Sequence, residues 1–227
     1  MQTSPVKPLK PWFQTIEDVG GSLNWSEFFG NEKPVQLDIG CGRGLFTVTA
    51  SKCHPESNFL GIEIDYREGR RGAARLLKRE QPNARIIGGD CKLVLAKMIE
   101  PGTVAAAHVY FPDPWWKKRH HKRRLFTRDF VDLLARVVES GGFVHSWSDV
   151  AEYFEIIQDL MGDHPEFETL SPPEEREAEN DMDYQTSFER KKRQLGLPVY
   201  RGLWQRIASS AAVRRPDSGF QGIQLGD

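Results

Sequence analysis

Short apolar runs alternate with segments of helical periodicity along most of the chain. From residue 35 onward, an apolar run ends near a glycine, a proline or an acid, and a stretch with apolar residues three and four positions apart follows. Such short continuous runs are typical of buried strands. The pattern predicts strands at 35–39, 59–64, 84–87, 104–111, 143–147 and 199–207. It predicts one helix that ends at residue 50, and further helices at 67–79, 93–98, 127–139, 151–161 and 186–193.

The order of these elements restricts the fold. A strand, a helix and a second strand form a right-handed crossover between parallel neighbours, so repeated alternation predicts a parallel sheet with helices on both faces. The helix at 127–139 is expected to stop at Gly141 and Gly142, and the strand at 199–207 is expected to join an edge of the sheet. The sequence therefore predicts an α/β fold with one mostly parallel sheet.

The same pattern divides the chain into three regions. Residues 1–34 are expected to form an extension with several prolines and one short helix near 23–29. Residues 35–208 carry every predicted strand and are numerous enough to bury one complete core, so we expect a single domain there. Residues 209–227 have little apolar surface to bury, so we expect a flexible tail.

Composition is that of an ordinary globular protein. Of the 227 residues, 39% are hydrophobic and 28% are charged, and no stretch approaches the roughly 18 consecutive apolar residues of a membrane span. The three cysteines lack the spacing of a metal site, which favours buried thiols over a disulfide or a zinc site. We therefore expect a cytoplasmic protein without a membrane segment or a bound metal, as either a monomer or a homodimer.

The charged residues are segregated along the chain, although the formal net charge is only −1. Acids alternate through 174–183, and a basic run follows the fourth predicted strand, with Lys117, Lys118, Arg119, Lys122, Arg123 and Arg124. A solvated surface is the ordinary interpretation of such a run, whereas a local basic surface also suits a polyanionic ligand. Because the basic run lies at the end of a predicted strand, we favour the interpretation that it binds a polyanionic ligand.

A glycine turn follows the strand at 35–39. It reads Asp38-Ile39-Gly40-Cys41-Gly42-Arg43-Gly44, and ligands of open parallel sheets bind at such turns. Dinucleotide sites use G-x-G-x-x-G and place a pyrophosphate where a nearby carboxylate would repel it. The G-x-G-x-G pattern and the acid before it instead favour a cationic ligand, such as the ammonium of a methionine moiety. We therefore expect S-adenosylmethionine as the cofactor, with contacts from Asp38, Gly40, Gly42 and Gly44.

Two further acids close the next two strands. Glu63 ends the strand at 59–64, where an acid accepts hydrogen bonds from ribose hydroxyls in nucleotide-binding sheets. Asp90 follows the strand at 84–87, from which it would reach the adenine amino group. Each acid taken alone is more simply a helix N-cap or a solvated loop residue. Three acids on one edge of the sheet favour a cofactor site.

The fourth predicted strand ends in a proline-rich motif. Pro112 and Pro114 flank Asp113 and fix the backbone on both sides of its carboxylate. Trp115 and Trp116 follow, and both are candidates for stacking on a nucleobase or for closing the pocket. Basic residues beside aromatics suit RNA, so we expect an RNA substrate, with phosphate contacts from Lys118, Arg119, Lys122, Arg123 and Arg124.

In these motifs the chain resembles the bacterial tRNA (guanine-N7-)-methyltransferases, whose signature is Pro-Asp-Pro-Trp followed by a lysine and a His/Arg-rich stretch. The resemblance covers about 35–206 and includes Gly61-Ile62-Glu63-Ile64, Ser148-Asp149 and Thr186-Ser187-Phe188-Glu189. It implies a Rossmann-like class I S-adenosylmethionine-dependent methyltransferase fold with a seven-stranded sheet. It also implies methyl transfer to N7 of a guanosine in tRNA, usually at position 46 of the variable loop.

The resemblance further assigns roles to individual residues. It implies cofactor contacts from Asp38, Glu63, Asp90 and Asp113, a catalytic role for Asp113, and substrate contacts from Lys117, Asp149, Thr186, Ser187, Phe188 and Glu189. Two departures concern geometry rather than charge, since Asp38 stands where many members have glutamate and Trp116 where proline is common. Without the resemblance, Thr186 followed by Glu189 is simply a helix capping box.

Other functions stay open at this point. A methyltransferase for another RNA or for a small molecule would share the cofactor site, but a small-molecule enzyme has no use for the basic, tryptophan-bearing loop. A non-catalytic RNA-binding module does not need Asp38, Glu63 and Asp90 around a glycine turn. An NAD-dependent oxidoreductase conflicts with the turn pattern and with Asp38.

Overall fold

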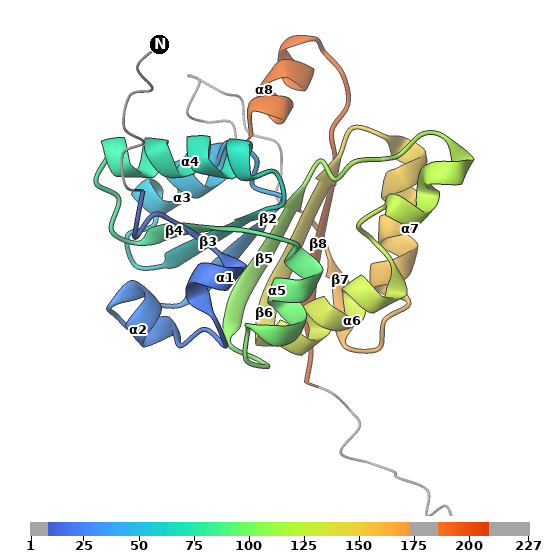
Figure 1. Ribbon diagram of the computed structural model, residues 1–227. Helices are drawn as coiled ribbons and strands as arrows, with labels where there is room; N and C mark the ends of the chain where they lie inside the picture. Colours follow the sequence, from blue (N-terminus) through green and yellow to red (C-terminus); the bar gives the residue numbers. More distant parts are fainter. Residues whose placement is uncertain (1–8, 173–185, 209–227) are drawn as a thin grey trace, which may run out of the picture.

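Eight strands form one sheet in the computed structural model, which describes residues 9–172 and 186–208 (Figure 1). The strands are β1 (Phe13–Thr15), β2 (Val35–Ile39), β3 (Asn58–Glu63), β4 (Ala84–Gly88), β5 (Val104–Tyr110), β6 (Val138–Ser148), β7 (Phe167–Leu170) and β8 (Tyr200–Arg206). The helices are α1 (Ile16–Val19), α2 (Trp25–Phe29), α3 (Leu45–Cys53), α4 (Tyr66–Lys78), α5 (Cys91–Lys97), α6 (Arg128–Val137), α7 (Ala151–Gly162) and α8 (Ser187–Gln194), with a 3-10 helix η1 (Lys118–Arg123). The acidic stretch at 174–183 and the tail at 209–227 lie outside the described residues.

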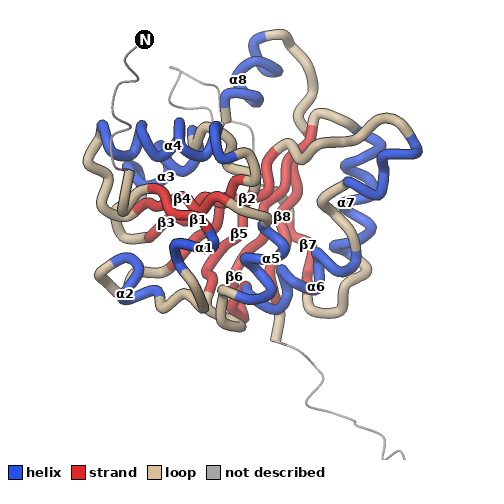
Figure 2. Tube along the Cα trace, in the orientation of Figure 1, coloured by secondary structure: helices blue, strands red, loops and turns tan. Residues whose placement is uncertain are grey.

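The sheet has the strand order β1-β4-β3-β2-β5-β6-β8-β7. Neighbours pair in parallel except at β8, which is antiparallel to β6 and to β7. Helices cover both faces of the sheet (Figure 2), so the predicted α/β class with a mostly parallel sheet is confirmed. After β2, the chain first adds β3 and β4 on one side of this strand, and it later adds β5 on the other side. The carboxyl ends of β2 and β5 therefore form the switch point at which ligands of such sheets bind.

The sheet has two strands more than the six predicted from the pattern, β1 and β7, and one more than the seven that the resemblance implied. Strand β1 belongs to the extension at 1–34. Its Phe13 pairs with Ile86 of β4. β1 and β7 have only three and four residues, too few for an alternation pattern to be recognised. The edge position predicted for the strand at 199–207 is also wrong, because β7 pairs with the side of β8 that faces away from β6.

The fifth predicted strand begins earlier than expected. β6 follows α6 directly, so Gly141 and Gly142 lie inside the strand and do not terminate the helix. The register of β6 against β5 shifts between Val104 and Ala106, which leaves extra residues of β6 looped out of the ladder. Gly141 has a φ of 85° and supplies the left-handed backbone that this irregularity requires.

Two apolar cores hold the helices against the sheet. One lies under α3 and α4, and a larger one lies under α2, α5, α6 and α7. α4 packs unusually closely on the sheet because small residues form its inner face. A Cβ on Gly72 would lie 2.6 Å from Cδ1 of Ile86 and 3.2 Å from the carbonyl oxygen of Arg43. The helix is therefore in contact with β4 and with the glycine turn that follows β2.

The cysteines differ in their surroundings. The prediction of buried thiols holds for Cys41 but is wrong for Cys53, which is exposed at the end of α3, and Cys91 is intermediate. Among the described residues, no helix has the length and apolar character needed to cross a bilayer. The same residues contain no group of three or more His, Cys, Asp or Glu arranged to hold a metal ion.

Candidate active site

Three glycines shape the turn between β2 and α3. Gly40, Gly42 and Gly44 have φ angles of 77°, 52° and 65°, all in the left-handed region. A Cβ added to Gly40 or Gly42 would meet no atom within 4 Å, whereas a Cβ on Gly44 would lie 3.3 Å from Cα of Gly72. The first two glycines thus leave the backbone open to a ligand, and the third allows α4 to pack against the turn.

A cleft of about 560 Å³ opens at the carboxyl ends of β2, β3, β4 and β5. This volume is within the range of small-molecule sites. Gly40 of the turn and the acids Glu63, Asp90 and Asp113 line the cleft, each acid following a different strand. The loop after β5 contributes Trp115, Lys122, Arg123 and Arg124 to the same lining. The structure therefore brings together three of the four acids assigned to the cofactor.

Asp38 is buried at the end of β2 and does not line the cleft. The residue is 3% exposed, and its Oδ2 accepts a 2.6 Å hydrogen bond from the hydroxyl of Thr47. Burial raises the pKa of Asp38 to about 7, while the hydrogen bond from Thr47 opposes this shift. A cationic group bound over the turn would favour the ionised carboxylate.

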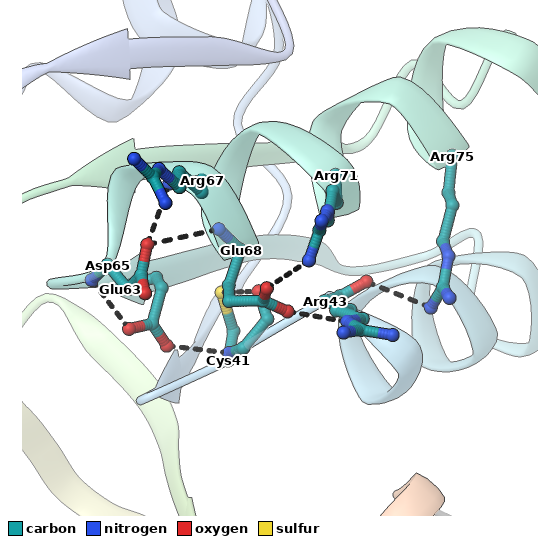
Figure 3. A network of polar contacts seen from close by, with 9 residues as sticks. Cys41, Arg43, Glu63, Asp65, Arg67, Glu68, Arg71 and Arg75 are labelled. Carbon is teal, nitrogen blue, oxygen red and sulfur yellow. Dashed lines mark hydrogen bonds and ion pairs between the residues drawn. The ribbon is translucent and has the colours of Figure 1, made fainter.

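Glu63 connects the glycine turn to the start of α4 (Figure 3). Its Oε2 accepts a hydrogen bond from the backbone N–H of Gly42 at 2.7 Å, and its Oε1 accepts one from the N–H of Asp65 at 2.8 Å. Asp65 in turn caps α4 by accepting from the N–H of Arg67 at 2.9 Å. Each oxygen of Glu63 keeps a further lone pair, so this carboxylate can hold the turn and also accept from ribose hydroxyls.

The glycine turn, Glu63 and Asp90 line one half of the cleft, and these residues fit S-adenosylmethionine. The side-chain-free backbone of Gly40 and Gly42 leaves space above the turn. Asp90 accepts one hydrogen bond as the N-cap of α5, from the N–H of Lys92 at 2.9 Å, which leaves acceptor capacity for an amino group. Carboxylates are the groups expected for a ligand that presents ribose hydroxyls, an adenine amino group and an ammonium.

The loop after β5 holds Asp113 in an exposed position at the cleft. Phe111 and Trp115 on either side have φ angles of 52° and 46°, a conformation that costs a non-glycine residue about 1–2 kcal/mol. Two hydrogen bonds fix the loop, one from the N–H of Phe111 to β6 at 2.8 Å and one from Nε of Arg124 to the carbonyl of Pro114 at 2.7 Å. The contacts of neighbouring residues therefore set the position of the Asp113 backbone.

Most of the basic run is exposed to solvent, namely Lys117, Lys118, Arg119, Lys122 and Arg123. Arg124 differs from them, because it is only partly exposed and holds the carbonyl of Pro114. Its guanidinium also lies 4.8 Å from the ring centre of Tyr153. Arg124 therefore supports the loop, whereas the other cations are available to a polyanion.

The two tryptophans of the motif have different surroundings. Trp115 lines the cleft, and the guanidinium of Arg123 lies 5.0 Å from its ring centre. Trp116 is 71% exposed. Neither ring belongs to the buried core, so both are available for stacking on a base.

Of the substrate residues assigned near the end of the chain, Asp149, Thr186 and Glu189 do not line this cleft. Asp149, which follows β6, forms an ion pair with Lys192 of α8 at 2.7 Å. Thr186 is the N-cap of α8 and accepts a hydrogen bond from the N–H of Glu189 at 3.0 Å, as in the capping interpretation. Residues 187–188 form the first turn of this helix. These contacts attach α8 to the carboxyl edge of the sheet.

Glu189 is enclosed within this second cluster. Its side chain is 3% exposed, and its Oε1 lies 3.3 Å from Nη1 of Arg193 and 3.4 Å from Nη2 of Arg201 in β8. The guanidinium of Arg201 lies 4.9 Å from the ring centre of Trp147. Glu189 therefore organises arginines from two elements instead of facing open solvent.

Sequence reasoning missed Tyr110, which ends β5 and lines the cleft. Its hydroxyl lies 2.9 Å from Nδ1 of His108, and Nε2 of this histidine meets the side-chain oxygen of Gln36 at 2.9 Å. Burial lowers the pKa of His108, so the imidazole is neutral at physiological pH. The signal was an aromatic residue at the last position of a strand, which an apolar pattern does not distinguish from core.

Relatives of known function share most of this chain. A family model described as putative methyltransferase matches residues 32–202. A tRNA (guanine-N(7)-)-methyltransferase of Rhodopirellula baltica is 41% identical over 209 residues, which cover 89% of this chain and 77% of that protein. One from Pseudoalteromonas atlantica is 35% identical over 195 residues, covering 85% of this chain and 81% of that protein.

Solved structures agree on the fold. The aminoglycoside resistance methyltransferase NpmB1 has a TM-score of 0.55 at 15% identity, over 80% of this chain and 91% of that chain. An S-adenosylmethionine-dependent methyltransferase of Aquifex aeolicus has a TM-score of 0.53 at 12% identity, over 80% and 87%. The fold is thus the Rossmann-like class I methyltransferase fold. With residues 32–202 matched by the family model and 89% of its length aligned at 41% identity to one of its members, the chain belongs to the bacterial tRNA (guanine-N7-)-methyltransferase family.

Proposed function

We propose that the protein transfers a methyl group from S-adenosylmethionine to N7 of a guanosine in tRNA, at position 46 of the variable loop. The observation that carries this proposal is a single cleft shared by acids suited to the cofactor and by a basic, tryptophan-bearing loop. The tRNA (guanine-N7-)-methyltransferases among its relatives support the same reaction. A tRNA substrate implies action in the cytoplasm.

On the cofactor side, the proposed roles follow the strand ends. Glu63 accepts hydrogen bonds from the ribose hydroxyls and Asp90 accepts from the adenine amino group. Gly40 and Gly42 let the backbone approach the ligand, and Gly44 keeps α4 in place. Ionised Asp38 lies buried behind the glycine turn, and its negative charge offsets the positive charge of the cofactor's ammonium on the other side of that turn.

On the substrate side, we assign guanosine contacts to Lys117, Asp149, Thr186, Ser187 and Phe188. Asp149 already holds Lys192, so this carboxylate accepts from the base by sharing or exchanging that partner. Glu189 is too enclosed to reach a base and acts by orienting Arg193 and Arg201.

The chemistry requires alignment more than proton transfer. S-adenosylmethionine supplies an electrophilic methyl group when it is bound. Guanine N7 presents an in-plane lone pair and carries no proton, so the protein needs no strong base and its main task is to position the purine. As a bond from the methyl carbon to N7 formed, the methyl–sulfur bond would break, so positive charge would pass from the sulfonium to the purine and a neutral thioether would leave. The carboxylate of Asp113 orients the base through hydrogen bonds and offsets this charge.

The proposed reaction is tested by incubating the protein with unmodified tRNA and labelled S-adenosylmethionine. N7-methylguanosine is a cationic purine, so borohydride reduction and aniline cleavage should cut the product RNA at one nucleotide of the variable loop. Cleavage at another position would refute the assignment to position 46. Label on a small molecule or another RNA, but never on tRNA, would support one of the alternative substrates.

The basic loop should contribute salt-dependent affinity for tRNA, except at Arg124. Replacing Lys122 and Arg123 by glutamine should reduce the salt dependence of tRNA binding. The slope of the logarithm of the association constant against the logarithm of the salt concentration should become shallower by about 1.5, because each neutralised phosphate contributes roughly 0.7–0.9 to this slope. Arg124→Gln should instead reduce turnover at saturating tRNA, because the carbonyl of Pro114 loses its donor. Binding titrations at several salt concentrations and single-turnover rates measure the two effects. Equal slopes for the double variant and the wild type would make this loop a solvated surface.

A further inference from the structure

A second basic surface lies outside the cleft, on α4. Four arginines spaced four residues apart, Arg67, Arg71, Arg75 and Arg79, recur on one side of this helix and at its end. Figure 3 shows the first three along α4, with Arg43 of the glycine turn beside them. We call these five residues the arginine ridge.

Few acids balance the arginine ridge. Glu68 is the only acid between residues 66 and 79, and it pairs with both Arg43 and Arg71. Nη1 of Arg75 donates to the carbonyl of Arg43 at 3.1 Å. Within the described part of the chain, Arg67 and Arg79 form no ion pair with a carboxylate. The arginine ridge therefore keeps a strong excess of positive charge on a chain whose formal net charge is −1.

This arrangement carries a cost in the free protein. Like charges four residues apart on a helix destabilise it by about 0.2–0.5 kcal/mol for each pair. The pKa of Arg75 is lowered by burial and by the nearby charges of Arg43 and Arg79. A polyanion bound along the helix would relieve this repulsion.

The arginine ridge begins next to the cofactor site. Arg43 belongs to the turn whose Gly40 lines the cleft, and Asp65, the N-cap of α4, donates its backbone N–H to Glu63. A ligand held in the cleft is therefore flanked by a cationic helix as well as by the basic loop after β5.

The two basic surfaces differ in one respect that identifies the partner. In the loop after β5, Trp115 lines the cleft and Trp116 is 71% exposed. The arginine ridge has no aromatic residue among its members, and Tyr66, at the first position of α4, is the only aromatic residue of that helix. Aromatic rings recognise unstacked bases of single-stranded segments, while guanidinium groups bind phosphates in pairs of hydrogen bonds whether or not the bases are paired. The composition of the arginine ridge thus suits the backbone of a paired stem.

We propose that the arginine ridge binds phosphates of a double-helical arm of the RNA substrate, outside the loop that enters the cleft. The inference rests on the proposed tRNA substrate. Four residues of helix rise about 6 Å, so the ridge presents successive cations along a line that can follow one RNA strand. The ridge would fix the orientation of a folded RNA without reading its sequence.

The test uses the double variant Arg67→Gln/Arg71→Gln. Both side chains reach the surface, Glu68 retains Arg43 as a partner, and Arg75 is left in place because it holds the turn. The control is Lys52→Gln/Lys97→Gln, which removes the same charge. Lys52 and Lys97 are exposed at the ends of α3 and α5, and these helices run back to the opposite edge of the sheet.

Dissociation constants for full-length unmodified tRNA and for a short single-stranded oligonucleotide with the sequence of the target loop are measured at several salt concentrations. For full-length tRNA, the ridge variant should show a slope shallower by about 1.5 and roughly tenfold weaker binding at low salt, while the control matches the wild type. The single-stranded oligonucleotide should bind the ridge variant and the wild type alike.

The outcomes separate this inference from the proposed function. A ridge variant that binds full-length tRNA like the wild type, with an unchanged slope, overturns the inference even if methylation is normal. Equal losses for the full-length tRNA and the single-stranded oligonucleotide also overturn it, because the ridge would then serve the target loop. A wild-type protein that methylates no tRNA refutes the proposed function instead.

Discussion

Replacing Asp113 with asparagine should lower the single-turnover rate of methyl transfer by about 10²–10³-fold, the range seen when one preorganised electrostatic group is removed from an active site. Asparagine keeps the size of the side chain and removes the charge that opposes the forming purine cation. Cofactor binds mainly through other strand ends, so its dissociation constant should change by only a few-fold. Rapid-quench assays and equilibrium binding measure the two quantities separately.

Asp163→Asn is the matched control for this variant, because Asp163 is an exposed acid at the end of α7 and lies outside the cleft. It should leave both quantities unchanged. If Asp113→Asn weakens cofactor binding as much as it slows transfer, Asp113 serves the cofactor and not the transition state.

Asp38→Asn should stabilise the cofactor-free protein, and the gain should grow with pH. The pKa of about 7 in the folded protein lies above the ordinary value of 3.8 for an aspartic acid side chain. The stability due to protonated Asp38 is therefore complete below pH 3.8 and is lost as the pH rises through 7. Between these limits the wild type should lose about 1.4 kcal/mol per pH unit relative to the variant. Denaturant unfolding of both proteins from pH 5 to pH 8 measures the difference.

The same variant should bind S-adenosylmethionine much more weakly, because the ammonium loses its buried counter-charge. In the wild type, cofactor affinity should fall as the pH drops below 7 and Asp38 takes up its proton. Thr47→Val removes the hydrogen bond that opposes the shift, so it should move this pH dependence upward. If Asp38→Asn binds the cofactor as tightly as the wild type at every pH, Asp38 is purely structural.

The central parallel strands and the acids at their carboxyl ends could be predicted from the sequence, because both depend on local patterns of residues. Glu63, Asp90 and Asp113 each follow an apolar run, and parallel strands bring their carboxyl ends to one edge. Predicting the runs and their direction was therefore enough to bring these acids together. The glycine turn carried its own signal, since its spacing is itself the structural requirement.

Contacts between distant segments were not predictable in this way. Arg124 belongs to a basic run by sequence, yet it supports Pro114 and packs on Tyr153 of α7. Glu189 fits a capping box, and only the position of β8 shows that Arg201 encloses it. Asp38 was expected at the cofactor, but its burial depends on the packing of α3 against β2. These roles follow from tertiary packing, which a single sequence does not encode in any spacing.

The insertion of β8 between β6 and β7 has a consequence for synthesis on the ribosome. β7 leaves the ribosome before β8 but has no neighbour in the sheet until residues 200–206 have emerged. The partner of Glu189 in β8 arrives at the same late moment. The strands that carry the glycine turn, Glu63 and Asp90 are already complete by then. A nascent chain therefore assembles its cofactor half first, and α8 is fixed in place only when translation has passed β8.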